Sequence, residues 1–548
     1  MRRRVRTVLT IAAAAAMCLA ASLPRFSSGD VAPGAFGRGS SSGARPPELP
    51  RQRVDTAEAF QRQRTIRVPA HGDLQEALDQ ARPGDWIALD DGATYEGSFR
   101  LPRKEASGWI VITGTSSDAR LPPPGQRVNP SHAPAMPKLV ASSGSVIVTE
   151  PAAHHYRFVG IEFGPTHGTF LRDLVQLGLN HTNVDAVPHH IIFDRCYLHG
   201  DPQKGTRRGI AMNSGNTAII DSYLSDFKEA GADSQAVAGW NGPGPFKIAN
   251  SFLEAAGENV LFGGADPSIP DLVPADIEIR GNHLAKPLRW RAGNRDFEGT
   301  QWSVKNLFEL KNARRVIIEG NVFEYNWPQS QNGFAILFTV RNQDGAAPWS
   351  IVEDVTFANN IVRHVASAIN VLGRDDIHPS RRTARIAIRN NLFVDVGGQW
   401  GGGRLFQLLD GTSDISIDRN TALQSDSLLF GGDHAPHTGF VFQDNIALHN
   451  RYGIIGSGTA TGRSSLDRYF PGALVRRNLI VGGRPELYPS GNFFPASVEQ
   501  VGFVSPQDGN YRLAASSSYR HAGPDGREPG ADLDAIARFG AVPQTKTR

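Results

Sequence analysis

The sequence is dominated by an imperfect repeat in which a short apolar strand ends in a small or amide residue and then resumes with apolar residues. The copies run from FVGIEF at 158–163 to FQDNIA at 442–447. The amide is usually asparagine, at Asn282, Asn321, Asn360, Asn391, Asn420 and Asn445. Successive asparagines lie roughly 25–39 residues apart, and a supersecondary unit with such a period indicates a solenoid. Solenoids present an extended side face to ligands, so the repeat also indicates where a site should lie.

The repeated units indicate β-strands rather than helix pairs. They are rich in Val, Ile and Phe, alternate with a period of two, and carry Asn, Asp and Gly at the bends. Asn tolerates left-handed backbone geometry, and its amide can bond to the same amide one coil away. A coil of three strands and three bends needs about 20 to 30 residues, so the longer spacings carry inserted loops. We therefore predict a parallel β-helix; a β-sandwich with coincidental Asn at its turns is the alternative.

Three passages resemble the right-handed parallel β-helix proteins of the pectate-lyase-like superfamily. Segment 74–97 indicates a short amphipathic helix followed by Pro-Gly-Asp and a first strand, the repeat follows, and segment 509–536 is similar to the tail that closes many bacterial members. The resemblance covers roughly residues 65–536. It implies an all-β, right-handed single-stranded parallel β-helix with an N-terminal helical cap and an irregular C-terminal cap. One fold hosts many activities, so the resemblance says more about fold than about function.

The N-terminus predicts a secretory signal peptide over residues 1–22, because MRRRVR precedes an apolar, Ala-rich run with small residues at its end. The run is too short for a stable membrane span, so we expect a secreted or periplasmic protein. Lipoprotein anchoring at Cys18 is disfavoured because Met17 stands where a small residue is needed. Composition divides the rest into a disordered linker (23–64), the β-helix (65–480), and a C-terminal capping segment and tail (481–548).

Charge and cysteine content exclude some classes of function. The formal net charge is +3, and no long basic run with interleaved aromatics is present, so nucleic acid is not an expected partner. Only Cys196 remains after the signal peptide, at a repeat position that Asn holds elsewhere. We expect a buried structural thiol rather than a nucleophile, and a monomer whose partner is an extracellular polysaccharide.

The strand before each Asn strand carries the richest outward-pointing polar strip. Alternation around Phe308 points Glu309 and Lys311 outward, and the same register points Thr339 and Arg341 outward one coil later. Adjacent coils lie about 4.8 Å apart, so Lys311 and Arg341 are predicted to stack. Like charges in register are unfavourable unless an anion is shared. A purely structural ion-pair ladder of the same side chains is the alternative.

Further polar and aromatic side chains flank this strip. The polar groups predicted to bind substrate are Asn312, Asn342, Asn370 and Gln407. The longest insertions, 286–305, 324–333 and 342–349, hold Trp290, Trp302, Trp327 and Trp349. Exposed Trp beside Arg, Asn and Asp suits sugar stacking with polar recognition. The alternative is that these tryptophans pack the loops onto the solenoid.

An acidic polysaccharide would use such a strip. In uronate β-elimination a base removes the proton next to the carboxylate, and a cation or metal stabilises the intermediate. The resemblance implies this option, because many members are pectate, alginate or chondroitin-type lyases that use Lys or Arg and often calcium. We predict Lys311 and Arg341 as base and charge stabiliser and Glu309 as the group that orients them or binds a metal. Lys305 and Arg374 are second choices.

A calcium site is a weaker prediction, with Asp344, Glu258 and Asp266 as its ligands. The sequence departs here from the family's clustered acidic ligands. Gly263 and Gly264 fit either a close backbone approach to a ligand or a tight bend that needs small residues.

Other functions stay open. A glycoside hydrolase on this fold would use paired Asp residues, and Asp375 and Asp376 exist, but the GHG and RIK motifs do not. A non-catalytic carbohydrate-binding or surface β-helix is the other alternative. The His pairs at 154–155 and 189–190 are predicted to lie in loops, and a metal site at His434 and His437 lacks further ligands.

Overall fold

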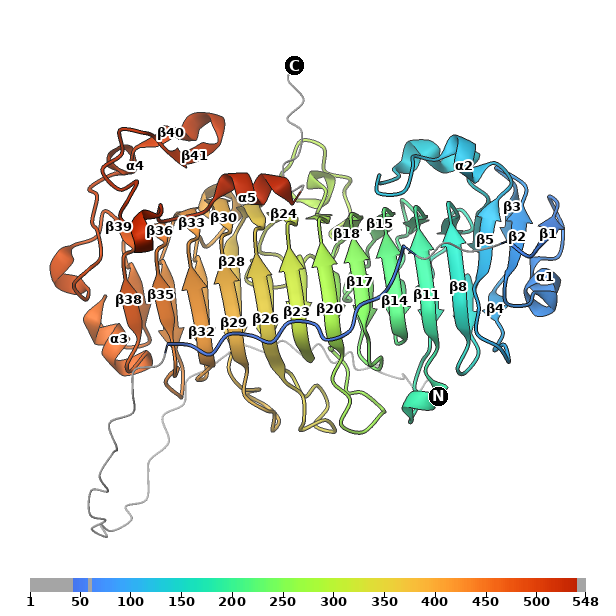
Figure 1. Cartoon of the computed structure of the whole chain (residues 1–548), viewed down its shortest axis with the longest axis horizontal. Helices are drawn as coiled ribbons and strands as arrows, with labels where there is room; N and C mark the ends of the chain where they lie inside the picture. The colour runs from blue at the N-terminus through green and yellow to red at the C-terminus, as the bar shows by residue number, and fades with distance from the viewer. Residues whose placement is uncertain (1–42, 58–61, 540–548) are drawn as a thin grey trace, which may run out of the picture. The chain divides into compact units, whose positions relative to one another are not determined.

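Three long parallel sheets form the molecule, which confirms the predicted parallel β-helix. The computed structural model describes residues 43–57 and 62–539, so the predicted signal peptide and Cys18 lie outside the described residues. Sheets A, B and C contain 14, 13 and 12 strands, and from β2 onward the chain visits them in turn, one strand per sheet in each coil. Figure 1 shows the coils stacked side by side along the solenoid.

Sheet A consists of β1 (Arg64–Val68), β2 (Asp85–Leu89), β5 (Ile110–Gly114), β8 (His154–Val159), β11 (His189–Asp194), β14 (Gly215–Ile220), β17 (Phe246–Ala249), β20 (Ala275–Arg280), β23 (Ala313–Glu319), β26 (Val352–Ala358), β29 (Ala384–Arg389), β32 (Ser413–Asp418), β35 (Val441–Gln443) and β38 (Leu474–Arg476). Sheet B consists of β3 (Thr94–Glu96), β6 (Lys138–Ala141), β9 (Glu162–Pro165), β12 (Tyr197–His199), β15 (Tyr223–Phe227), β18 (Phe252–Ala255), β21 (His283–Ala285), β24 (Val322–Asn326), β27 (Ile361–Val365), β30 (Leu392–Val396), β33 (Thr421–Gln424), β36 (Ile446–Leu448) and β39 (Leu479–Val481). Sheet C consists of β4 (Phe99–Leu101), β7 (Ile147–Thr149), β10 (Asp173–Leu177), β13 (Arg208–Met212), β16 (Gln235–Gly239), β19 (Glu258–Phe262), β22 (Phe308–Leu310), β25 (Phe334–Thr339), β28 (Ser367–Leu372), β31 (Phe406–Leu409), β34 (Leu429–Gly432) and β37 (Ile454–Gly456).

Alternate residues of each strand point into the solenoid and stack in register. In sheet C one inward column consists of Val175, Ile210, Val237, Val260, Phe308, Ile336 and Ile369, all fully buried. One hydrophobic cluster continues from Val68 to Tyr488. Each coil therefore buries its apolar face only against its neighbours, which is why the repeat must continue for the fold to be stable.

The predicted asparagine ladder is present. The backbone N–H of Asn321 donates to the side-chain oxygen of Asn360 at 2.9 Å, and that of Asn360 donates to Asn391 at 2.9 Å. The Asn360 side-chain nitrogen also donates to the carbonyl of Ile318. The ladder continues through Ser251, Ser222 and Cys196 at one end and through Asn478 and Asn492 at the other. Burial raises the pKa of the Cys196 thiol to about 12, so it stays protonated as a structural group.

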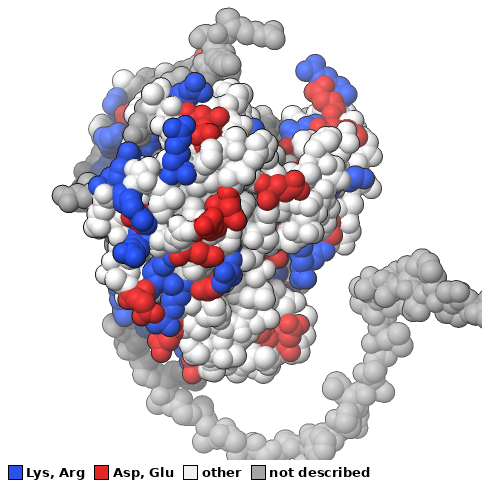
Figure 2. Space-filling view, turned by 90° about the vertical axis from the view of Figure 1, so that its right-hand side faces the viewer, with Lys and Arg blue, Asp and Glu red and all other residues white. Residues whose placement is uncertain are grey.

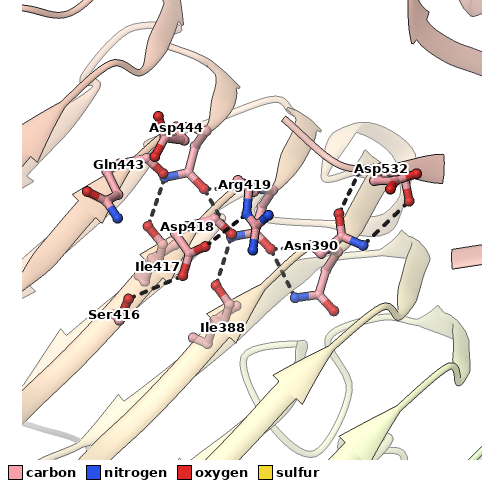
Figure 3. A network of polar contacts seen from close by, with 12 residues as sticks. Ile388, Asn390, Ser416, Ile417, Asp418, Arg419, Gln443, Asp444 and Asp532 are labelled. Atoms are coloured by element: carbon pink, nitrogen blue, oxygen red, sulfur yellow. Dashed lines mark hydrogen bonds and ion pairs between the residues drawn. The ribbon is translucent and has the colours of Figure 1, made fainter. Parts of the chain in front are cut away.

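The left-handed residue of each bend directly precedes the ladder residue. Examples are Gly281, Gly320, Asn359 and Asn390, with φ of 63°, 67°, 58° and 53°. The ladder Asn itself is therefore not the left-handed residue, and it stabilises the bend through the hydrogen bonds of its side-chain amide. Figure 3 shows Asn390 at such a bend, where its side-chain oxygen accepts the N–H of Asp532 at 2.6 Å. This bond fixes the start of α5 (Leu533–Arg538).

Both ends of the solenoid are covered. At the N-terminal end α1 (Leu74–Gln80) buries Leu74, Ala77 and Leu78. At the C-terminal end Leu466 and Tyr469 of α3 (Arg463–Tyr469) pack into the main hydrophobic cluster. The α5 helix instead lies on the outer face of sheet B (Figure 1), where Ile536 packs against Val322, Ile361 and Leu392. The C-terminal segment also contains α4 (Val498–Val501) and the antiparallel pair β40 (Phe503–Ser505) and β41 (Asn510–Leu513), while α2 (Ser117–Arg120) lies in an early loop.

Residues 43–57 lie across sheet A as an extended segment, here called the strap (Figure 1, dark blue). Its backbone N–H groups at Arg45, Glu48 and Arg51 donate to the carboxylates of Asp414, Asp354 and Asp276, at 3.1, 2.9 and 2.8 Å. The three acids stand on alternate coils, which two steps of about 4.8 Å separate by about 9.6 Å. A polyproline II chain repeats every three residues, about 9.3 Å, so the two periods match.

The strap differs from the sequence-based assignment of 23–64 to a disordered linker. Its Pro-rich composition cannot form a core of its own, but an extended chain needs only acceptors at the matching period. Val54 anchors its far end, buried against Trp109, Ile192 and Ala218. No helix in the described ranges is long and apolar enough to cross a membrane. On the face in Figure 2 acidic and basic side chains are interspersed.

Candidate functional site

Two cavities lie along the outer face of sheet C and meet at Lys311. The larger, of about 750 Å³, covers the coils from β10 to β22. The smaller, of about 320 Å³, covers the coils from β22 to β34. Lys311 lines both of them, so the two form one groove across the stacked coils.

The larger cavity combines cations with an apolar rim. Phe170 and Leu179 are 41% and 46% exposed, which is unusual for apolar side chains of this size. Trp240 lies half-buried beside them with the Arg208 guanidinium 5.0 Å from its ring centre. Arg172 lines the same cavity and is exposed, without a carboxylate partner among the residues described.

The other cations near the larger cavity are held by carboxylates. Arg208 contacts Asp173 at 2.6 Å. Lys305 bridges Asp233 at 2.6 Å and the fully buried Glu258 at 2.8 Å. Burial opposes the charge on Lys305, but Glu258 and Asp233 outweigh it and hold the Lys305 pKa above its ordinary value. Lys305, a second choice for catalysis, is therefore fixed in an ion-pair network.

Lys311 has a looser partner. Its Nζ lies 3.7 Å from Glu309 Oε1, and its side chain is 17% exposed while that of Glu309 is 2% exposed. Glu309 also accepts from Asn306 at 3.1 Å and from the Thr339 hydroxyl at 3.2 Å. The buried carboxylate is thus satisfied by neutral donors, and the ammonium of Lys311 stays available to the cavities.

Gly263 provides the space beside Lys311. The residues that follow β16, β19 and β22 are Trp240, Gly263 and Lys311, one below another on consecutive coils. A Cβ on Gly263 would lie 2.9 Å from the Lys311 Cβ. Both Gly263 and Gly264 line the larger cavity and have left-handed backbones, so they serve a tight bend and an open groove together.

The predicted register of β25 is wrong by two residues. Leu337, not Thr339, lies opposite Glu309, because Phe338 pairs with Leu310. Arg341 therefore lies beyond the strand end and is not stacked on Lys311 in the sheet, although its N–H donates to the Lys311 carbonyl at 2.9 Å. Both side chains still line the smaller cavity.

Arg341 is engaged by two acids. Its Nη1 donates to Asp375 at 2.6 Å and also to Asp376. Although partial burial opposes it, the bond from Arg341 holds the pKa of Asp376 below its ordinary value. The charge of Arg341 is thus offset, while its Nη2 and Nε donors have no carboxylate contact among the described residues.

The predicted substrate-binding amides divide into two groups. Asn370 lines the smaller cavity and accepts from Gln407 at 3.0 Å, in the Glu309 column as expected. Asn312 and Asn342 are buried: Asn312 donates to the Leu272 carbonyl and Asn342 to that of Pro379. Their amides hold bends and do not reach the groove. Arg374 is exposed, and neither cavity includes it.

The tryptophans of the insertions do not form a sugar platform. Trp290, Trp302 and Trp327 are 2%, 6% and 5% exposed and pack together in a separate cluster. Lys228 Nζ lies 5.2 and 5.1 Å from the ring centres of Trp290 and Trp302. Burial of these large rings stabilises the inserted loops against the solenoid. The alternative that the tryptophans pack the loops is therefore correct for these three.

The acids predicted to bind calcium are not gathered. Glu258 is buried against Lys305, while Asp266 accepts the N–H groups of Asp344 and Ala346 at 3.0 and 2.8 Å. Asp344 itself is exposed. Calcium needs several oxygen ligands around one point, and these three acids are not gathered around one among the described residues. They do not fit one calcium site.

Sequence reasoning missed the apolar and cationic lining of the larger cavity, namely Phe170, Arg172, Arg208 and Trp240. A signal for Trp240 existed, since it follows a repeat strand at the position that Lys311 occupies two coils later. No periodic signal exists for Phe170 and Arg172, which lie just before β10 outside the aligned strands.

Comparisons with known proteins support the fold. No protein-family model and no curated protein matches the chain. Among solved structures, the PL6 family alginate lyase AlyGC is 13% identical with a TM-score of 0.51, over 88% of this chain and 59% of that one. A mannuronic acid specific polysaccharide family 6 lyase from human gut microbiota is 13% identical over 80% of this chain and 93% of that one, with a TM-score of 0.49. The catalytic unit of a GH87 α-1,3-glucanase from Streptomyces thermodiastaticus is 13% identical over 79% and 68%, also with 0.49. At this identity the likeness to AlyGC, with its TM-score of 0.51, shows a shared parallel β-helix fold.

Proposed function

We propose that the chain is a secreted polysaccharide-active protein that binds an anionic polysaccharide along sheet C and cleaves it by β-elimination, with Lys311 as the base. The observation that carries the proposal is the position of Lys311 where the two cavities meet. Its carboxylate partner lies at 3.7 Å, whereas those of Arg208, Lys305 and Arg341 lie within 2.6 Å. Apart from the exposed Arg172, Lys311 is thus the groove cation least committed to an internal ion pair.

The larger cavity suits the uronate unit. Arg172 and Arg208 line it and can meet the carboxylate, and Phe170 and Trp240 offer apolar surface to a sugar ring. The smaller cavity is lined by four acids, Glu309, Asp376, Asp410 and Asp433, and by two cations, so it suits a neutral or less charged part of the polymer.

The reaction then needs one proton transfer. Lys311 in its neutral form takes the proton from C5 of the uronate, and the electron pair forms the double bond between C4 and C5 while the bond from C4 to the linking oxygen breaks. The departing oxygen takes a proton from water or from the Lys311 ammonium. The negative charge that develops on the carboxylate faces the guanidinium groups of the larger cavity.

A hydrolytic mechanism is less compatible with the groove. Inverting or retaining hydrolysis needs a protonated carboxylic acid near neutral pH. Asp375 and Asp376 both bind Arg341. Although partial burial opposes it, the bond from Arg341 lowers the pKa of Asp376 and so favours its charged form. The buried Glu258 is held charged in the same way, because Lys305 and Lys311 outweigh the opposing effect of burial and lower its pKa.

The test is the ultraviolet absorbance of unsaturated products from a panel of uronate polysaccharides, with and without calcium. Lys311→Ala should lower the rate about 10²–10⁴-fold, the usual contribution of a general base, while binding to the same polymer persists. Lys247→Ala is the matched control, an outward lysine of sheet A that bonds to Thr56. If the unaltered protein binds the polysaccharide without cleaving it, the proposed lyase activity is wrong and the chain is a carbohydrate-binding protein. If the Lys311 variant cleaves at the same rate, Lys311 is not the base.

A further inference from the structure

Four histidines form a cluster at the start of two neighbouring strands of sheet A. The sequence predicted loops at 154–155 and 189–190, but these pairs begin β8 and β11. His154 lies opposite His189 in the strand register. The rings of His154 and His189 stack with centres 5.0 Å apart, and those of His155 and His190 stack at 4.4 Å.

A backbone irregularity brings the two rings of each pair together. The second histidine of each pair is left-handed, with φ of 62° at His155 and 56° at His190. This breaks the strand alternation, so neighbouring side chains meet instead of pointing to opposite faces. The Nδ1 atoms of His154 and His155 lie 2.8 Å apart, and those of His189 and His190 lie 2.6 Å apart.

The second ring nitrogens have partners that set the tautomer. His154 Nε2 lies 3.0 Å from the Lys104 carbonyl. A carbonyl can only accept, so Nε2 of His154 carries a proton and donates to that carbonyl, while Nδ1 lies toward the cluster. His190 Nε2 lies 2.9 Å from Nδ2 of Asn216, which donates to it. Such outer contacts are those that orient imidazoles in metal sites.

The cluster is enclosed but reachable. His155 and His190 line a cavity of about 350 Å³ together with Trp109 and with Arg53 and Asp55 of the strap, while His154 and His189 lie beside them. All four rings are half-buried. Burial, reinforced by the neighbouring histidines, lowers the pKa of His155 and of His189 to about 4. Imidazoles gathered at a sheltered, polar cavity are ligands that first-row divalent metals prefer.

We propose that the His155, His189 and His190 cluster, supported by His154, is a binding site for one divalent transition metal ion that favours imidazole, such as Zn²⁺. One ligand atom from each of the three lies within 4.8 Å of the others, and no other described group of His, Cys, Asp or Glu side chains is so placed. A bound ion would cross-link two coils beside the strap. The site lies on sheet A and the groove on sheet C, so the metal-site proposal does not depend on the proposed function of the groove.

The test is titration of the mature protein, freed of metal by a chelator, with Zn²⁺ by calorimetry, and with Co²⁺ by visible absorption. We expect one ion per chain, a cobalt spectrum typical of nitrogen ligands, and a rise in the thermal unfolding midpoint on adding Zn²⁺. The His155→Ala/His190→Ala variant should lose all three. Asn216→Ala keeps every ligand and should weaken binding about 10–100-fold, as loss of an outer contact does.

Matched controls separate binding from folding. His167→Ala, at a ring that is 92% exposed, should bind as the unaltered protein does. Circular dichroism of each metal-free variant checks that the fold persists. Failure of the unaltered protein to bind, or equal binding by the double variant, would overturn the proposal; Ca²⁺, which prefers oxygen ligands, should not compete, and competition would also contradict it.

Discussion

Among single residues, Gly263 keeps open the space in which Lys311 stands. Its φ is +94°, and an added Cβ would lie 2.6 Å from the Asn312 backbone nitrogen and 2.9 Å from the Lys311 Cβ. Neither atom lies at the free end of a flexible side chain. Any side chain at position 263 must therefore move Lys311 and the bend that carries it.

Gly263→Ala should abolish most cleavage while the protein still folds. Left-handed Ala costs roughly 1–2 kcal/mol, which a solenoid of this size tolerates. Gly293→Ala is the matched control, because its φ is +85° but its Cβ would meet no atom within 4 Å, and it lines neither cavity. Urea unfolding and cleavage rates of both variants provide the measurement. An equal loss of activity in the two variants would contradict the role given to Gly263.

The asparagine ladder is also decided residue by residue. Asn360→Ala removes the acceptor of the Asn321 N–H and the donor to the Ile318 carbonyl, both inside the solenoid. Each buried group left without a partner costs about 1–3 kcal/mol, so the urea midpoint should fall clearly. Asn332→Ala, at an exposed position, should leave it unchanged. A midpoint for Asn360→Ala within error of the control would show that the ladder is dispensable.

Among the elements, the strap is held by charge. The Asp354 carboxylate accepts hydrogen bonds from the Arg385 guanidinium and from the Glu48 N–H. The Asp276 carboxylate accepts them from the Arg315 guanidinium and from the Arg51 N–H. Burial opposes ionisation of both carboxylates, but these partners outweigh it and hold each pKa below the ordinary value. The strap therefore depends on carboxylates that stay charged.

The strap should detach in acid. A carboxylate whose pKa is lowered by docking stabilises the docked state fully above its free pKa of about 3.9, and this contribution is lost as pH falls through the lowered value. Hydrogen exchange at the Glu48 and Arg51 amides should thus be slow near neutral pH and lose its protection below that range. Protection that persists in acid would show that apolar contacts such as that of Val54 hold the strap instead.

On the scale of the whole molecule, the groove runs along the stack of coils. From β10 to β34 it crosses eight steps of about 4.8 Å, which makes it about 38 Å long. A groove of this length suits several consecutive sugar units of an extended chain, and each coil contributes one part of it.

Affinity should therefore rise with oligosaccharide length until the groove is filled. Titrations with oligosaccharides of increasing length, using Lys311→Ala to prevent cleavage, would measure this. A plateau is expected at lengths near 38 Å. Affinity that is already maximal for a disaccharide would mean that only the pocket around Lys311 binds the ligand.

The repeat made the fold predictable because stacked coils need the same side chain at the same place. The apolar columns and the asparagines recur for that reason. Cys196 occupies one position of the same ladder. The register of β25 was not predictable from alternation, since a shift of two residues keeps Ile336 and Phe338 inward and leaves the pattern unchanged. The side chains that surround Lys311 could therefore be identified only from the structure.

The strap and the loop tryptophans show the other limit of sequence reasoning. Each depends on a surface formed by residues far away along the chain. The composition of a segment predicts only how that segment behaves in isolation, and a Pro-rich segment in isolation forms no hydrophobic core. The acids that bind the strap, Asp276, Asp354 and Asp414, come from coils more than 200 residues later, and no local pattern links them to it.

The most direct test of the central claim is mass spectrometry of the products formed in oxygen-isotope-labelled water. Elimination at Lys311 breaks the bond without adding water, so the new ends should carry an unsaturated uronate and no label, and Lys311→Ala should form almost none. Products that incorporate one labelled oxygen per cleavage would show hydrolysis and contradict the account.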